Sequence, residues 1–205
     1  MKEIALIWMS AGNSYFNEKN IGKLLNFSDK NFNRIIILSP DKPAEHTFRA
    51  LGYLDNKAKR KAKLNANLLT NRAKRELEKI KNKSKFSFVD WENDIAKNSE
   101  YKEKYKEIIA LYNGNSKFRK DVRLTTKRVI EEKTNEIQNI EKSVEEAVSY
   151  LLEEISFILS CPVIYQVQKV SYLYHQTWEV FEKLIAGEYD GKKLDKFSFV
   201  LTGIN

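Results

Sequence analysis

The sequence predicts an α/β fold, a single Rossmann-like domain in which helices flank a mostly parallel, five-stranded sheet. Short runs rich in Ile, Val and Phe alternate along the chain with longer segments of helical periodicity. This alternation favours parallel strands joined by right-handed helical crossovers. With 205 residues and a 42% hydrophobic composition, the chain is long enough for one sizeable core and too short for two comfortable ones. We therefore expect residues 1–205 to form one domain.

Five segments are expected to be strands. The first two, residues 3–9 and 34–38, are apolar almost throughout, which suits strands covered on both faces. The other three are expected at residues 86–89, 162–167 and 197–201. Ligands bind beyond the carboxyl ends of the strands in such sheets. Residues that directly follow a strand are therefore the first candidates for a functional site.

Helical patterns occupy the intervals between the strands. Residues 43–51 open with a proline, which suits a first helical turn. The other expected helices cover residues 20–27, 55–84, 100–112, 117–140, 143–159 and 177–186. Only seven Gly and three Pro occur in the chain, and no stretch of them marks a domain boundary.

Positive charge is concentrated in the basic helix expected at residues 55–84. The whole chain carries +8, but between Lys57 and Lys85 twelve Lys or Arg stand against two Glu, which gives +10 there and −2 elsewhere. A stripe of Ala and Leu at spacings of three and four predicts that this helix docks on the body and exposes its cations. Such an excess is either a solvated face or a contact for a polyanion. Because no aromatic residues are interleaved, duplex RNA backbone fits better than stacking on single-stranded bases.

The stretch "IWMSAGNSYF" leads from an apolar run into Ser10 and then into a turn. This serine either caps the following helix or is a nucleophile at the carboxyl end of the first strand. No G-x-G-x-x-G or G-x-x-x-x-G-K-[ST] occurs, which counts against a dinucleotide site and a P-loop. Ser10 is not in a G-x-S-x-G either, which counts against an α/β-hydrolase.

Two further pairs of residues carry polar chemistry. Tyr150 and Glu154 are four apart on an expected helix and so share one face, where they can hold an ammonium group and accept its proton. Their apolar neighbours predict a largely buried helix, in which a carboxylate needs a cationic partner. Tyr174 and His175 follow the fourth expected strand. Taken singly, each pair is more often incidental than catalytic.

The single cysteine, Cys161, excludes an internal disulfide and favours a reducing compartment. The apolar run at the start of the chain is too short for a signal peptide, and no uninterrupted apolar run approaches 18 residues. We therefore expect a cytoplasmic protein without a membrane partner.

Taken together, the quoted segments resemble one family, the tRNA-dependent cyclodipeptide synthases. "SAGNSYFNEKN" resembles the segment with that family's nucleophilic serine, and "YLLEE" and "LYHQ" resemble its other catalytic segments in order and spacing. The resemblance covers nearly the whole chain. It implies a Rossmann-like domain similar to the catalytic domain of class I tyrosyl- and tryptophanyl-tRNA synthetases. The chain lacks their "HIGH" and "KMSKS" signatures. Since an aminoacyl-tRNA is already an activated ester, neither ATP nor a metal or other cofactor is expected.

The resemblance implies a ping-pong acyl transfer. Ser10 takes the aminoacyl group of a first aminoacyl-tRNA. The amine of that group attacks a second aminoacyl-tRNA, and the resulting dipeptidyl-enzyme closes to release a 2,5-diketopiperazine. By resemblance, Tyr150 and Glu154 hold the first amino group, Asn13 positions the dipeptidyl chain, Tyr174 relays a proton and His175 supports the site. The tRNA acceptor arm would lie on Lys61, Lys63, Arg72, Lys74, Arg75 and Lys79.

The chain departs from the family pattern in two places. Asn71 precedes Arg72 where a pair of arginines is expected, and Trp8 stands where glycine or another small residue is expected. Because side chains alternate along a strand, Leu6, Trp8 and Ser10 should point the same way. Trp8 then either lines the pocket of the first aminoacyl side chain, together with Leu6 and Phe157, or is a core tryptophan.

Two other functions compete with a synthase. One is a non-catalytic RNA-binding Rossmann-like module, and the other is a serine esterase or peptidase. The ordered set of a serine, two tyrosines and a glutamate argues against the first. The absence of a convincing Ser-His-Asp order argues against the second. The favoured interpretation is a monomeric enzyme whose partners are two aminoacyl-tRNAs and not DNA.

Overall fold

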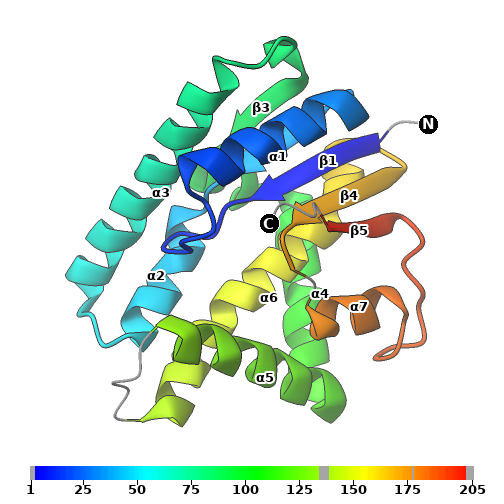
Figure 1. Cartoon of the computed structure of the whole chain (residues 1–205). Coiled ribbons are helices and arrows are strands. Elements are labelled where there is room, and N and C mark those ends of the chain that lie inside the picture. Colours follow the sequence, from blue (N-terminus) through cyan, green and yellow to red (C-terminus); the bar gives the residue numbers. More distant parts are fainter. Residues whose placement is uncertain (1–2, 134–138, 177, 202–205) are drawn as a thin grey trace.

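The computed structural model describes residues 3–133, 139–176 and 178–201. One parallel sheet crosses it in the order β3-β2-β1-β4-β5 (Figure 1). Its strands are β1 (Glu3–Trp8), β2 (Ile35–Leu38), β3 (Phe86–Val89), β4 (Lys169–Tyr174) and β5 (Phe197–Leu201). Every pairing between neighbouring strands is parallel. The predicted fold class is confirmed.

Strand β1 lies at the centre of the sheet. Ala5 is in register with Ile35 of β2 on one side and with Ser171 of β4 on the other. Residues 4–8 are buried, as expected for a strand covered on both faces. The chain order reverses between β1 and β4, which makes the crevice beyond their carboxyl ends the favoured ligand site.

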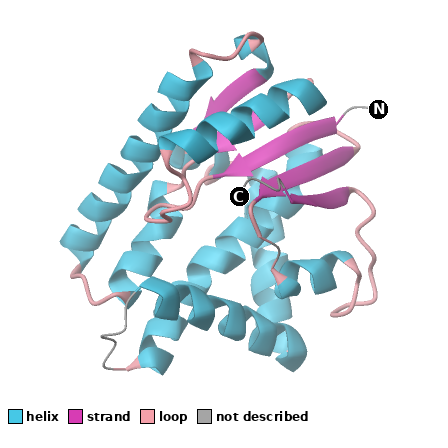
Figure 2. Cartoon of the chain, viewed as in Figure 1, coloured by secondary structure: helices cyan, strands magenta, loops and turns pink. Residues whose placement is uncertain are grey.

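Helices cover both faces of the sheet, with α1 over one face and α4 and α6 over the other (Figures 1 and 2). The α-helices are α1 (Glu18–Asn31), α2 (Asp41–Ala50), α3 (Asp55–Leu77), α4 (Ser99–Gly114), α5 (Ser116–Lys133), α6 (Ile140–Ile164) and α7 (Glu179–Ile185). Two short turns, η1 (Lys83–Lys85) and η2 (Trp91–Ile95), flank β3. Within the expected helix 117–140, residues 134–138 lie outside the described residues, and so does residue 177 of the expected helix 177–186.

The strand expected at residues 162–167 is wrong, because α6 continues through Ile164 and the fourth strand begins at Lys169. Ile158, Cys161 and Pro162 are buried at spacings of three and four, whereas Val163 is 57% exposed. This is helical periodicity. The apolar run 161–164 resembles a strand by composition alone, but packing of one helical face on the core decides its structure.

The basic helix is also shorter than expected, ending at Leu77 and not at residue 84. The amides of Lys79 and Ile80 bond to carbonyls three residues earlier, which tightens the last turn. Ile80 is buried in the core. The chain therefore leaves the helix axis here, and Lys79 lies beyond the end of α3.

Helix α6 is the central helix of the core. Its length and mean hydropathy of 1.6 would allow it to cross a membrane, but 67% of the apolar window is buried inside the protein. Its neighbours are α2, α4 and α5. It brings the predicted residues Tyr150 and Glu154 beneath the carboxyl edge of the sheet.

Candidate active site

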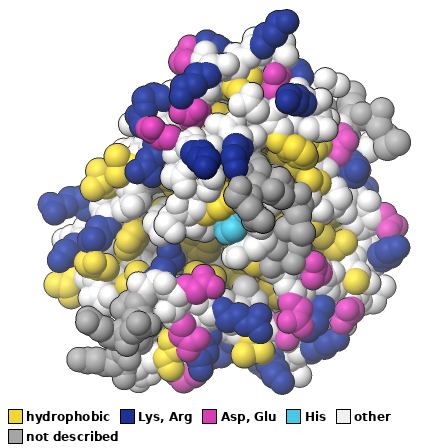
Figure 3. Space-filling view, viewed as in Figure 1, with side chains coloured by type: hydrophobic (Ala, Val, Ile, Leu, Met, Phe, Trp, Pro, Cys, Tyr) yellow, Lys and Arg dark blue, Asp and Glu magenta, His cyan; other side chains and the backbone are white. Residues whose placement is uncertain are grey.

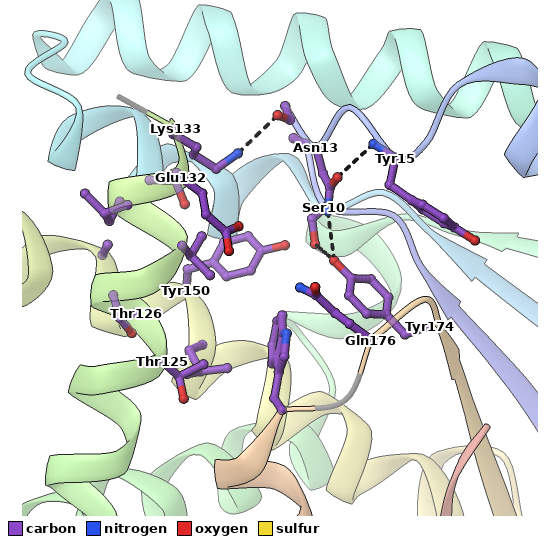
Figure 4. Close-up of a pocket in the computed structure, with 18 of the residues that line it drawn as sticks. Ser10, Asn13, Tyr15, Thr125, Thr126, Glu132, Lys133, Tyr150, Tyr174 and Gln176 are labelled. Atoms are coloured by element: carbon purple, nitrogen blue, oxygen red, sulfur yellow. Dashed lines mark hydrogen bonds between the residues drawn. The ribbon is translucent and has the colours of Figure 1, made fainter. Parts of the chain in front are cut away.

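Three of the predicted catalytic residues meet at the carboxyl ends of β1 and β4 (Figure 4). Ser10 follows β1, and Tyr174 is the last residue of β4. Ser10 Oγ lies 3.4 Å from the Tyr174 hydroxyl, and Asn13 Nδ2 donates a hydrogen bond of 3.1 Å to the same oxygen. The Ser10 hydroxyl and the Tyr174 phenol are thus close enough to exchange a proton.

A tight turn holds Ser10 in place. The Asn13 amide donates to the Ser10 carbonyl, and Asn13 Oδ1 accepts from the Tyr15 amide at 2.9 Å. Gly12 adopts a φ of +76°, a conformation that glycine allows without strain. The expectation that Ser10 caps the next helix is wrong, because Asn17 is the N-cap of α1 and accepts from the Asn20 amide.

Tyr150 reaches the same place from α6. It lines the cavity beside Ser10, and its hydroxyl oxygen accepts a 2.7 Å hydrogen bond from the indole Nε1 of Trp8. Burial, and then the nearby carboxyl of Glu154, raise the pKa of Tyr150 well above its ordinary value. The phenol therefore stays neutral and acts as a hydrogen-bonding group rather than as an anion.

Glu154 is almost completely buried, with 1% of its surface exposed. Its Oε1 accepts a 2.5 Å hydrogen bond from the Tyr172 hydroxyl, whereas its Oε2 has no partner in the described part of the chain. Burial raises the pKa of Glu154 to about 8, and the bond from Tyr172 opposes this rise. An ammonium group brought to the unpaired oxygen would stabilise the carboxylate.

His175 packs among aromatic rings. Its ring stacks on Tyr15 with centroids 3.9 Å apart and lies beside the Tyr174 ring at 4.4 Å. Burial lowers its pKa, which favours the neutral imidazole. No partner for its buried Nδ1 lies among the residues described. The side chain thus braces Tyr174 and the turn that carries Ser10.

A cavity of about 390 Å³ opens beside Ser10. Figure 4 shows its opposite wall, which α5 provides. Sequence reasoning missed this wall, whose residues are Thr125, Thr126, Val129, Ile130, Glu132 and Lys133. The spacing of Thr126, Ile130 and Lys133 follows one helical face, but nothing in the sequence says which element that face meets.

Lys133 ties the α5 wall to the Ser10 turn. Its Nζ donates a 3.1 Å hydrogen bond to the Gly12 carbonyl. Burial lowers the pKa of Lys133, and Glu132 opposes this effect. The bond closes one side of the cavity and helps to fix the turn from across it.

The expected first-substrate pocket of Leu6, Trp8 and Phe157 stays a prediction. Leu6, Trp8 and Phe157 are all fully buried, and none of them lines the cavity. Trp8 packs on Trp91 and Phe157, with ring centroids 5.8 and 5.9 Å away. Trp8 is thus packed in the core directly behind Tyr150, which does line the cavity.

The cations of the basic helix differ in their surroundings. Arg72 Nη1 donates to the Phe16 carbonyl at 3.3 Å, and Arg75 forms an ion pair with Glu18. Lys61 and Lys74 lie over aromatic rings, Lys79 pairs with Glu76, and Lys63 is exposed. Figure 3 shows Lys and Arg side chains along the α3 side and near a hollow in this face. Through its bond to the Phe16 carbonyl, Arg72 links the basic helix to the loop that follows Ser10.

Comparison with known proteins decides the family. Residues 2–202 match the sequence model of a family described as cyclodipeptide synthase. The chain belongs to the cyclodipeptide synthase family. It is therefore an aminoacyltransferase that forms peptide bonds. This excludes the alternative function of a non-catalytic RNA-binding module.

A curated relative in the cyclodipeptide synthase family is the cyclo(L-leucyl-L-leucyl) synthase of Staphylococcus haemolyticus, 24% identical over 98% of this chain and 87% of its own. A cyclodipeptide synthase structure from Bacillus thermoamylovorans superimposes with a TM-score of 0.85, at 25% identity and with 97% and 87% of the two chains covered.

Two more distant structures share the fold. One, from Mycobacterium tuberculosis, has a TM-score of 0.79 at 20% identity, covers 97% and 84% of the two chains, and is described as related to type I tRNA synthetases. The other, from Candidatus Glomeribacter gigasporarum, is bound to Phe-tRNAPhe. Its TM-score is 0.68 at 16% identity, with 100% and 88% covered. Both structures agree with the predicted Rossmann-like fold of this cyclodipeptide synthase.

Proposed function

We propose that this cyclodipeptide synthase joins the aminoacyl groups of two aminoacyl-tRNAs through an aminoacyl-enzyme on Ser10. The observation that carries the proposal is the meeting of Ser10, Asn13 and Tyr174 beside a cavity, at the point where the strand order reverses. The tRNA-bound structural relative supports aminoacyl-tRNA as the donor. The product is a cyclic dipeptide.

In the first transfer, Ser10 Oγ attacks the carbonyl carbon of the aminoacyl ester. The bond to the ribose oxygen breaks, and the proton lost by the serine ends on that oxygen of the departing tRNA. The Tyr174 hydroxyl, 3.4 Å from Oγ, is placed to relay it. Splitting the reaction through a covalent intermediate replaces one difficult step with two easier ones.

The ammonium of the bound aminoacyl group is then held by Tyr150 and Glu154. Burial raises the pKa of Glu154 to about 8, so its carboxylate accepts a proton far more readily than an exposed carboxylate does. A proton can therefore pass from the ammonium to the carboxylate at little cost. Since Glu154 is not on the cavity wall, side chains of that wall must shift when the acyl group binds.

The freed amine attacks the carbonyl carbon of the second aminoacyl ester and forms the peptide bond. The bond to the ribose oxygen of the second tRNA breaks, and that oxygen takes the proton lost by the amine as the tRNA leaves. The new terminal amine then attacks the carbonyl carbon of the serine ester, the bond to Ser10 Oγ breaks, and the ring leaves. The amine gives up a proton as Ser10 regains one, and Tyr174 relays it. Asn13, bonded to Tyr174, positions the dipeptidyl chain, and His175 braces this arrangement.

The acceptor arms of the tRNAs are proposed to lie along the basic helix and its C-terminal turn. Phosphates would contact Lys61, Lys63, Arg72, Lys74, Arg75 and Lys79. The bond from Arg72 to the Phe16 carbonyl connects that surface to the segment after Ser10. We further propose that the enzyme is a cytoplasmic monomer that binds neither DNA nor a membrane.

The deciding experiment is incubation of the protein with a mixture of charged tRNAs. Mass spectrometry then searches for dipeptide masses less one water. We expect a defined set of cyclic dipeptides. No product from any pair of amino acids, with fully charged and active tRNA, would overturn the proposal.

A further inference from the structure

Strand β4 presents two stacked phenols to the site. Tyr172 and Tyr174 are two residues apart and so lie on the same face of the strand. Their ring centroids are 5.8 Å apart, with planes inclined by 23°. The Tyr174 hydroxyl forms hydrogen bonds with Ser10 and Asn13, whereas the Tyr172 hydroxyl donates to Glu154. The two hydroxyls thus contact the two ends of the catalytic arrangement.

The carboxyl of Glu154 depends on this one donor. Tyr172 bonds Oε1 at 2.5 Å, and both side chains are buried. The titratable groups that interact with Glu154, among those described, are the phenols of Tyr150 on α6 and of Tyr172 and Tyr174 on β4. None of these groups is a cation. A buried carboxyl with neither a cation nor a donor would remain protonated.

We propose that Tyr172 is a positioning residue of the reaction, because it holds Glu154 by one oxygen and leaves the other as the acceptor for the ammonium of the first aminoacyl group. The inference rests on the proposed function. It deepens that function by assigning the orientation and the ionisation of Glu154 to a phenol that the reaction does not otherwise use. Tyr172 itself does not line the cavity.

The direction of the effect follows from the hydrogen bond. A donor to the charged form of a carboxyl lowers its pKa, and the Tyr172 bond does so against the larger effect of burial on the pKa of Glu154. Without the hydroxyl, Glu154 should ionise only at a higher pH. The ratio of carboxylate to carboxylic acid at pH 7 falls roughly tenfold for each unit by which the pKa rises.

The test substitutes Tyr172→Phe, which keeps the ring and its stacking on Tyr174. We expect cyclic dipeptide formation to fall severalfold or more at about pH 7 and to recover as the pH rises. The titration of Glu154, followed by NMR with ¹³C-labelled glutamate and assigned with Glu154→Gln, should move to higher pH. The melting temperature is measured in parallel.

Tyr189→Phe is the matched control. Tyr189 is also buried and donates a 2.8 Å bond to a carboxylate, that of Asp121, but it does not line the cavity. Its loss can lower stability. It should leave both the pH profile of product formation and the titration of Glu154 unchanged.

A second variant tests the role of Tyr172 if Tyr172→Phe fails to fold. 3-Fluorotyrosine at position 172 retains the hydroxyl but is a stronger donor, so it should move the Glu154 titration and the rate profile to lower pH. An unchanged titration or an unchanged profile in these variants would overturn the inference. A wild-type protein that makes no cyclic dipeptide would overturn the proposed function instead, and the NMR titration would still report whether Tyr172 controls this carboxyl.

Discussion

The indole Nε1 of Trp8 donates a 2.7 Å hydrogen bond to the hydroxyl oxygen of Tyr150. The two rings meet edge to face with centroids 6.1 Å apart. Since the phenol oxygen accepts from Trp8, its own proton remains available to Ser10 or to a substrate. The large residue found where a small one is expected therefore fixes, from inside the core, the phenol that is proposed to hold the first amino group.

Trp8→Gly tests whether the indole of Trp8 also limits the size of the first aminoacyl side chain. Removing a fully buried indole should destabilise the domain by roughly 3–5 kcal/mol. The space opened beside Tyr150 should shift the products toward larger first residues. In the wild-type enzyme we expect leucine and phenylalanine to be poor first substrates. Product ratios and melting curves are measured together.

Phe118→Ala is the control for Trp8→Gly. Phe118 is also fully buried and packs on Tyr189, outside the cavity wall. It should lower stability without changing the product ratios. A folded Trp8→Gly variant with wild-type product ratios would remove Trp8 from substrate selection.

Ser10→Ala removes the proposed nucleophile while leaving the turn and its backbone hydrogen bonds in place. We expect loss of cyclic dipeptide, together with loss of the aminoacyl adduct that mass spectrometry of the intact wild-type protein should detect. The melting temperature should change little, because Ser10 does not cap α1. An alanine variant that still forms product would require another nucleophile.

Stability should depend on pH through Glu154. Its pKa is raised from 4.5 in the unfolded chain to about 8 by burial. The folded protein therefore keeps a proton that the unfolded chain has lost, and stability falls as the pH rises through this window. Glu154→Gln has no such proton. Its free energy of unfolding relative to wild type should increase from pH 5 to pH 8, by up to about 1.4 kcal/mol per pH unit.

Denaturant unfolding at several pH values measures this difference. Glu107→Gln is the control, because Glu107 is an exposed residue in a surface pair with Lys104, and such pairs contribute little to stability. A Glu154→Gln variant whose stability follows that of wild type at every pH would contradict the raised pKa.

The contact between Ser10 and Tyr174 could be anticipated only from the family resemblance, which groups these two residues in one catalytic site. The bond between Tyr172 and Glu154 could not. The fourth strand was expected at residues 162–167, and only with β4 at Lys169–Tyr174 do Tyr172 and Tyr174 acquire a common face. The α5 wall was hidden for a similar reason, since periodicity identifies a face but not its neighbour.

Charge reversal on the basic helix should weaken the use of charged tRNA. Arg72→Glu and Arg75→Glu are expected to raise KM for charged tRNA with little dependence on its sequence, because phosphate contacts carry no sequence information. Affinity should fall with salt by roughly 0.9 log unit per log unit for each duplex phosphate contacted, and the variants should show a smaller slope.

The two arginines differ in their contacts within the protein. Arg72 also donates to the Phe16 carbonyl, so its reversal can disturb the loop after Ser10, whereas Arg75 pairs only with the exposed Glu18 among the residues described. Arg75→Glu therefore isolates the charge effect. Lys193→Glu is the control, since Lys193 lies on the surface, between α7 and β5. If Arg75→Glu and Lys193→Glu have the same KM and salt slope, the tRNA contact lies elsewhere.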